Sequence, residues 1–122
     1  MTALVWCPFP DRGSAEAAAD RLLDRGLVAC ANIIGGMQSL FVWNGERGAA
    51  DEVGVLFKTD AALLEEVVQA VAEAHPYDCP AVLGWPCTAA TAGTAGWLSA
   101  LTGAGRRGGP VQRSGWAAGA GD

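Results

Sequence analysis

The dipeptide Asn44-Gly45 lies between long apolar stretches, and this arrangement constrains the fold more than any other sequence feature. Asn and Gly both tolerate the positive φ of a two-residue hairpin turn, so the dipeptide predicts a tight β-hairpin. Apolar runs at 27–34 and 37–43 precede the turn and are separated by Gly35-Gly36. Residues 52–59 follow it with alternating apolar side chains. We therefore expect a long, bent antiparallel hairpin in the middle of the chain.

A strand and a helix are expected before this hairpin. The short apolar run at 3–7 is typical of a buried strand, which Pro8 and Pro10 should end. Apolar residues then recur at helical spacing, with Ser14 placed to cap the helix at its N-terminus. Gly26 is placed to end it in the left-handed conformation.

A second helix and strand are expected after the hairpin. The helix should cover 61–74, with Asp60 as its N-cap and Pro76 beyond its end. The strand at 81–86 lies between prolines, which favours an edge position, and a short helix can follow at 91–101. The order β-α-β-β-α-β-α is typical of an α+β, ferredoxin-like split βαβ sandwich with an extended hairpin. Because its strands are apolar on both faces, such a small domain should form homo-oligomers.

Length and charge narrow the classes of protein that this chain can be. Its 122 residues fit one domain at 1–102, followed by a tail at 103–122 whose seven glycines predict disorder. The net charge of −5 argues against nucleic-acid binding. The N-terminus has no signal-peptide pattern and no apolar run is long enough to span a membrane, so we expect a cytoplasmic protein. Its four cysteines include no C-x-x-C pair and are expected to be reduced.

Several short motifs resemble those of a known family in both order and spacing. They are Ala29-Cys30-Ala31-Asn32, Phe41-Val42-Trp43-Asn44-Gly45, Glu52-Val53, Phe57-Lys58-Thr59, His75-Pro76-Tyr77 with Pro80, and Trp97-Leu98. Over roughly residues 2–101 this set resembles the CutA family of divalent-cation tolerance proteins. Each motif alone is weak, but the ordered set is fairly specific.

The resemblance implies a ferredoxin-like subunit in a bacterial homotrimer whose subunits extend one another's sheets. It also implies a role in tolerance of copper and other divalent cations. By the same resemblance, clefts between subunits gather Trp43, Glu52, Lys58 and Tyr77. Trp85 is expected as a further cleft or interface aromatic.

The chain departs from the family pattern at three positions that matter for a ligand. Phe41 stands where the family usually has Tyr, and Asn44 and Ala81 stand where it commonly has Glu. Two carboxylates and one hydroxyl are therefore absent. Hard cations need several oxygen ligands, so we expect this chain to hold them less well.

Cys7, Cys30 and His75 are the candidate metal ligands. Both cysteines match positions at which family members also carry Cys, and sulfur with imidazole suits a soft ion such as Cu(I). His75 and Cys79 could also form half of a transition-metal site. The alternative is structural: the two cysteines are small buried side chains on strands, and His75 caps the helix at 61–74.

Two functions remain open from the sequence. The first is binding of divalent or soft metal ions, with copper as the candidate metal, and no catalysis. The second is an enzyme that performs cyclisation, elimination or isomerisation on a small organic molecule in the cleft, with Lys58, Tyr77, His75 and Asp78 as candidate acid/base groups. A trimeric sensor similar to PII proteins is a further alternative that rests on fold alone.

The tryptophans and Lys58 also have structural interpretations. Trp6 and Trp97 are expected in the core. Lys58, the only lysine, can form a salt bridge with Glu52 across a subunit interface as readily as it can bind a ligand. Tyr77 can equally pack at an interface with its hydroxyl hydrogen-bonded.

Overall fold

The structure is a computed structural model that describes residues 1–102. The tail expected at 103–122 lies outside the described residues. Within the described part, no helix is long and apolar enough to cross a membrane. The elements are β1 (Thr2–Phe9), α1 (Arg12–Asp24), β2 (Cys30–Trp43), β3 (Glu46–Asp60), a single 3-10 turn η1 (Ala61–Leu63), α2 (Leu64–Ala74), β4 (Leu83–Pro86) and α3 (Ala92–Ser99).

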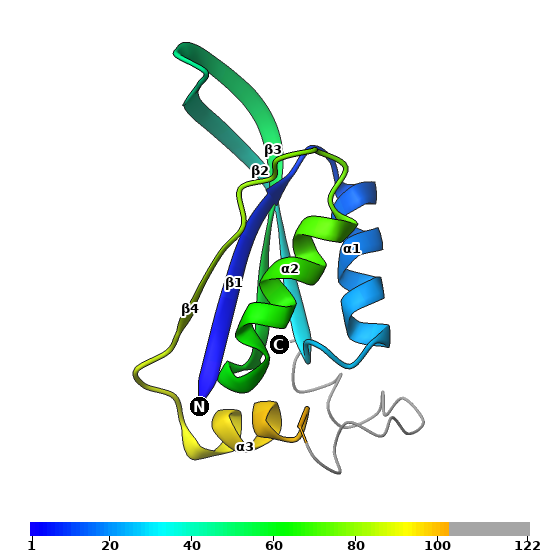
Figure 1. Ribbon diagram of the computed structural model, residues 1–122, viewed down its shortest axis with the longest axis vertical. Coiled ribbons are helices and arrows are strands. Elements are labelled where there is room, and N and C mark those ends of the chain that lie inside the picture. The colour runs from blue at the N-terminus through cyan, green and yellow to red at the C-terminus, as the bar shows by residue number, and fades with distance from the viewer. Residues whose placement is uncertain (103–122) are drawn as a thin grey trace.

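The strands form one antiparallel sheet in the order β2-β3-β1-β4. Helices α1 and α2 lie side by side on one face of this sheet, and α3 lies near the N-terminus (Figure 1). The arrangement confirms the α+β, ferredoxin-like split βαβ fold expected from the order of the elements. The edge position expected for β4 is also confirmed.

The β2–β3 hairpin turns at Asn44-Gly45, as predicted. Both residues have positive φ, 52° and 80°, which is the requirement of the mirror-image turns that match strand twist. Trp43 pairs with Glu46 directly beside the turn, so β3 begins at Glu46 and not at residue 52 as expected. The small residues at 48–50 hid this part of the strand, because they carry little of the alternation that marks a strand.

A bulge joins the two strands that were expected at 27–34 and 37–43 into the single strand β2. The register with β3 shifts between Ile34 and Met37, where Gly36 adopts a φ of 70°. A bulge takes up extra residues without ending the pairing, and it bends and twists the strand. In Figure 1 the hairpin curls away from the rest of the sheet beyond this region.

Strand β1 continues through Pro8 to Phe9, and the expectation that it ends at Pro8 was wrong. Its pairing with β4 ends at Trp6, so at Pro8 the strand has β3 as its one neighbour in the sheet. A proline has no N–H to donate to a neighbouring strand. It is tolerated at a position where the strand has a neighbour on one side only.

The first helix is capped by Asp11 and not by Ser14. The backbone of Asp11 is extended, and its carboxylate accepts a hydrogen bond of 2.7 Å from the Ser14 main-chain N–H. This bond and a side-chain hydrogen bond with Ser14 lower the pKa of Asp11. Gly26 follows the helix with a φ of 68°, as predicted.

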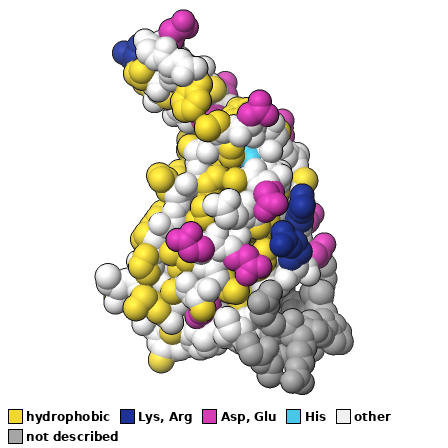
Figure 2. Space-filling view, viewed as in Figure 1, with side chains coloured by type: hydrophobic (Ala, Val, Ile, Leu, Met, Phe, Trp, Pro, Cys, Tyr) yellow, Lys and Arg dark blue, Asp and Glu magenta, His cyan; other side chains and the backbone are white. Residues whose placement is uncertain are grey.

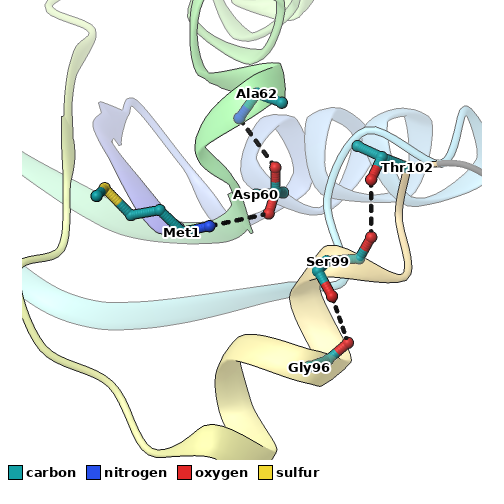
Figure 3. Close-up of polar contacts among 6 residues, drawn as sticks. All are labelled: Met1, Asp60, Ala62, Gly96, Ser99 and Thr102. Carbon is teal, nitrogen blue, oxygen red and sulfur yellow. Dashed lines mark hydrogen bonds and ion pairs between the residues drawn. The ribbon is translucent and has the colours of Figure 1, made fainter.

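Asp60 caps the second helical segment, as predicted, and also holds the chain's N-terminus. Its carboxylate accepts from the Ala62 N–H at 2.9 Å and lies 3.6 Å from the Met1 ammonium (Figure 3). The segment opens with one 3-10 turn before α2 begins at Leu64. In the same view, Ser99 and Thr102 make local hydrogen bonds at the end of α3.

The core lies between the sheet and the two long helices. Alternate residues of β1 and β3, among them Val5, Phe9 and Phe57, are fully buried on this face. They pack against small and branched side chains of α1 and α2. From α3, Leu98 is fully buried and Trp97 is half-buried.

The opposite face of the sheet is apolar and uncovered, as expected from strands that are hydrophobic on both sides. Ile34, Leu83 and Trp85 remain 49%, 64% and 43% exposed. Figure 2 shows hydrophobic side chains gathered along the β4 edge and on the projecting hairpin. Trp6 lies between the buried residues Val5 and Cys7 of β1, so strand alternation places its side chain on this uncovered face. It is half-buried and packs over Gly54. The expectation that Trp6 lies in the core was therefore wrong.

We predict that Gly54→Ala lowers the free energy of unfolding by about 1–3 kcal/mol, as expected of overpacking. An added Cβ would overlap the Trp6 ring. Gly93→Ala is the control, because its Cβ would meet nothing within 4 Å and alanine favours the helix. Urea denaturation measures both. Trp6→Leu should make Gly54→Ala much less costly, and additive effects would contradict this account.

Candidate functional site

A cleft of about 620 Å³ lies between the hairpin and the segment that follows α2. Residues from β2 and β3 form one wall, and residues 77–81 form the other. This segment passes beside the base of the hairpin in Figure 1. The lining consists of Pro8, Ser39, Phe41, Val42, Trp43, Ala50, Glu52, Tyr77, Asp78, Cys79 and Ala81.

Strand alternation builds the hairpin wall. Ser39, Phe41 and Trp43 are two residues apart and therefore share a face of β2. Ser39 pairs with Ala50, so the β3 residues Ala50 and Glu52 lie on the same face. Phe41 pairs with Gly48, and its ring occupies the space that a side chain at Gly48 would take.

His75 fixes the other wall to the end of β1. The ring is buried, its Nε2 lies 2.8 Å from the Pro8 carbonyl oxygen, and its Nδ1 accepts a 3.1 Å hydrogen bond from the Tyr77 N–H. Nε2 therefore carries the proton that it donates to Pro8. The ring also stacks on Phe9 with 4.4 Å between centroids. His75 thus positions Tyr77 in the cleft, and its two nitrogens are both engaged with backbone groups.

His75 also ends helix α2, which agrees with its structural interpretation. Its main-chain N–H bonds the Ala72 carbonyl at the C-cap position. The imidazole reaches the β1 carbonyl and not the helix carbonyls. To bind a metal, either ring nitrogen would have to give up its present hydrogen bond.

Cys7 and Cys30 lie on opposite faces of the sheet. Cys7 pairs with Val55 and Cys30 with Lys58, and these partners are three positions apart along β3. An odd offset places side chains on opposite faces. Burial raises the pKa of the Cys7 thiol to about 12, with a smaller contribution from the charge of Glu52.

The expected ligand set of Cys7, Cys30 and His75 is therefore not brought together within one subunit. Across residues 1–102, no group of three or more His, Cys, Asp or Glu side chains is arranged to hold a metal ion. Glu52, Asp78 and Cys79 line the same cleft without forming such a set. One subunit by itself does not fit a metal ion.

Comparison with known proteins identifies the family. The model of the CutA1 divalent ion tolerance protein family matches residues 3–100. The chain belongs to the CutA1 family. A divalent-cation tolerance protein CutA from Pyrococcus horikoshii is 39% identical over 80 residues, covering 66% of this chain and 78% of that protein. The CutA protein of Pectobacterium atrosepticum is 31% identical over 97 residues, covering 80% and 88%.

Solved CutA1 structures share this fold. The crystal structure of CutA1 from Pyrococcus horikoshii superposes with a TM-score of 0.76 at 33% identity, covering 83% of this chain and 98% of that one. CutA1 from Ehrlichia chaffeensis gives a TM-score of 0.77 at 28% identity, covering 84% and 95%.

Two of the three departures from the CutA pattern lie in the cleft. Phe41 and Ala81 both line it. Asn44 forms the turn beyond it, where its φ of 52° suits Asn better than a longer side chain. Phe41 and Ala81 thus contribute apolar side chains to the cleft.

The candidate residues divide between this cleft and the uncovered face. Trp43, Glu52, Tyr77 and Asp78 line the cleft, whereas Lys58 and Trp85 do not. Lys58 lies six positions after Glu52 along β3, which is about 20 Å in a regular strand. Within one subunit the two cannot form a salt bridge.

Lys58 and Trp85 lie instead on the sheet. Lys58 pairs with Cys30 between β2 and β3, and Trp85 pairs with Leu4 at the β4 edge. A role for either residue in the cleft would require a neighbouring subunit.

Other cleft residues were missed by reasoning from the sequence. They are Pro8, Ser39, Val42 and Ala50, and Cys79 was considered only as a partner for His75. The period of two in a strand could have indicated Ser39 from Trp43. No local signal could have indicated Pro8. It lies beside the segment after α2 because its carbonyl accepts a hydrogen bond from His75, which is 67 residues away in the sequence.

We predict that Cys79 reacts with iodoacetamide at pH 8 well before Cys7. Cys79 is exposed, whereas Cys7 is fully buried and its raised pKa keeps it protonated. Peptide mass spectrometry after timed alkylation measures both rates, and urea should expose Cys7. Rapid labelling of Cys7 in the folded protein would contradict its position.

The raised pKa of the Cys7 thiol predicts a loss of stability at alkaline pH. The Cys7 thiol ionises near its ordinary pKa of 9.0 when unfolded and near 12 when folded. Its stabilising contribution is complete below pH 9 and is lost as the pH rises toward 12. Urea midpoints measured over this range should fall less steeply for Cys7→Ala than for the native chain.

We predict that His75→Phe lowers the free energy of unfolding by about 1–3 kcal/mol. Phenylalanine retains the stacking on Phe9 but leaves the Pro8 carbonyl and the Tyr77 N–H without partners. Tyr77→Phe is the control, because the Tyr77 main chain makes the bond. Equal stability of the two variants in urea would show that the hydrogen bonds contribute little.

Proposed function

We propose that this CutA1 family protein acts in divalent-cation tolerance by binding the cation as a homotrimer. The observation that carries the proposal is the cleft, which collects two carboxylates and a thiol from one subunit. Oxygen and sulfur donors together suit borderline and soft ions such as Zn²⁺ and copper.

Assembly is supported by the uncovered apolar face. Leu83 and Trp85 expose much of their surface on this face, and Leu40 and Val42 do so on the hairpin. Contiguous exposed apolar surface marks contact sites with other proteins. Both edge strands, β2 and β4, also leave backbone groups free to pair with a neighbouring subunit.

The oligomer also supports the cation site. Glu52, Asp78 and Cys79 line one cleft but are not close enough together to hold an ion. A metal site usually needs about four ligands. A neighbouring subunit would complete the set, so binding and assembly should depend on each other.

Native mass spectrometry of the metal-depleted protein, titrated with Zn²⁺ or copper, tests this proposal. We expect a trimer that takes up metal, with uptake at least about tenfold weaker in Cys79→Ser because a structural thiolate ligand is lost. Cys87→Ser is the matched control, because Cys87 lies outside the cleft. A trimer that takes up no metal, or equal uptake by the two variants, would contradict the proposal.

The second candidate function is binding and conversion of a small organic molecule in the same cleft. The aromatic lining favours it, because organic ligands bind in largely apolar clefts of 300–1,000 Å³ with a few polar groups. Tyr77, Asp78 and Glu52 would supply any acid/base chemistry. His75 would position Tyr77, and Lys58 could contribute only from another subunit.

Cytoplasmic localisation and the PII-like sensor stay predictions.

A further inference from the structure

Within one subunit, the cleft carries negative charge without a matching positive charge. Its ionisable carboxylates are Glu52 and Asp78, and no Lys, Arg or His is among its lining residues. Neither carboxylate forms an ion pair within residues 1–102, where the ion pairs are Met1–Asp60 and Arg12–Glu16. The sequence as a whole is also acidic, with a net charge of −5. A ligand that enters here meets a field that favours cations.

Three aromatic side chains line the same cleft. Phe41, Trp43 and Tyr77 are exposed by 43%, 58% and 45% in the single subunit. The face of an aromatic ring carries negative electrostatic potential and attracts ammonium groups, with Trp the strongest. Aromatic walls with carboxylates are the usual combination for recognising organic ammonium ions.

The lining suits an organic cation better than a bare metal ion. A hard metal ion needs several oxygen ligands at short distances, which one subunit does not assemble. An alkylammonium ion is larger and needs a few hydrogen-bond acceptors with apolar contact around them. Phe41 and Ala81 add to this apolar contact.

We propose that the cleft binds a small organic cation, an amine or quaternary ammonium that carries an apolar group. The charged nitrogen lies between Glu52 and Asp78, and the apolar group contacts Phe41, Trp43 and Tyr77. This proposal rests on the second candidate function, because it names the chemical class of ligand for the same cleft. It is independent of metal binding.

Isothermal titration calorimetry of the assembled protein with EDTA present tests the proposal on the native chain. The probes are phenethylamine, benzyltrimethylammonium, phenethyl alcohol and phenylacetate, which share a phenyl ring and differ in charge. We expect both cations to bind at least about tenfold more tightly than the alcohol, and phenylacetate not to bind. Equal affinity for the alcohol, or no binding of either cation, would overturn the proposal.

Variants then test whether the cleft carboxylates and the aromatic rings contribute to phenethylamine binding. Glu52→Gln and Asp78→Asn should each weaken phenethylamine binding about five- to tenfold, because each removes one negative charge from the cleft. Glu66→Gln makes the same change on the exposed side of α2 and should leave binding unaltered. Trp43→Leu should weaken binding and Trp43→Phe should largely preserve it. Native mass spectrometry confirms that each variant keeps the native assembly.

The outcome separates this proposal from metal binding. Cys79→Ser should reduce metal uptake far more than phenethylamine affinity, whereas Trp43→Leu should reduce phenethylamine affinity far more than metal uptake. Cation binding in EDTA by a protein that takes up no metal would leave the organic-cation proposal standing alone. If the carboxylate variants bind phenethylamine as tightly as Glu66→Gln does, the cleft carboxylates do not recognise the ligand and the proposal fails.

Discussion

The antiparallel pairing of β3 with two neighbours at once is the interaction on which the rest of the molecule depends. From Val53 to Asp60 this strand pairs with β1, while it pairs with β2 from the turn down to Lys58. Because β1 ends at Phe9, the outer part of the hairpin has no third strand beside it. The hairpin can therefore curl, and its curled arms form one wall of the cleft.

A single histidine connects this sheet to the other wall. His75 ends α2, donates a hydrogen bond to the Pro8 carbonyl near the end of β1, and accepts one from the Tyr77 main-chain N–H. Removing a buried donor or acceptor leaves its partner unsatisfied, which costs more than the net contribution of the bond to stability. The segment that carries Tyr77, Asp78 and Cys79 is thus kept beside the hairpin by contacts within the core of the subunit.

The period of two along a strand explains the contrast between the two faces. The same alternation that buries Cys7 against the helices leaves Cys30 and Lys58 on the uncovered face. It also gives the sheet a second apolar face, which two helices cannot cover. The uncovered face bears on assembly, and the cleft bears on ligand binding.

Local signals predicted the elements well and their limits less well. Asn44-Gly45, Gly26 and Asp60 have the conformations or contacts expected of them, because turns and caps depend on a few neighbouring residues. Asp11 replaced Ser14 as the cap because both are good cap residues three positions apart, and sequence alone does not choose the first helical turn. The end of β1 depended on its neighbour β4. Because the pairing of β1 with β4 ends at Trp6, β1 can continue through Pro8.

The sequence by itself determined the order of the elements, the tight turn, the apolar character of both sheet faces and the motifs of the CutA1 family. Tertiary structure decided which of the candidate residues meet. Trp43, Glu52, Tyr77 and Asp78 line one cleft, whereas the expected metal ligands are separated by the sheet. The physical reason is that strand register and a hydrogen bond across 67 residues set these distances, and neither is encoded in the local pattern around any one residue.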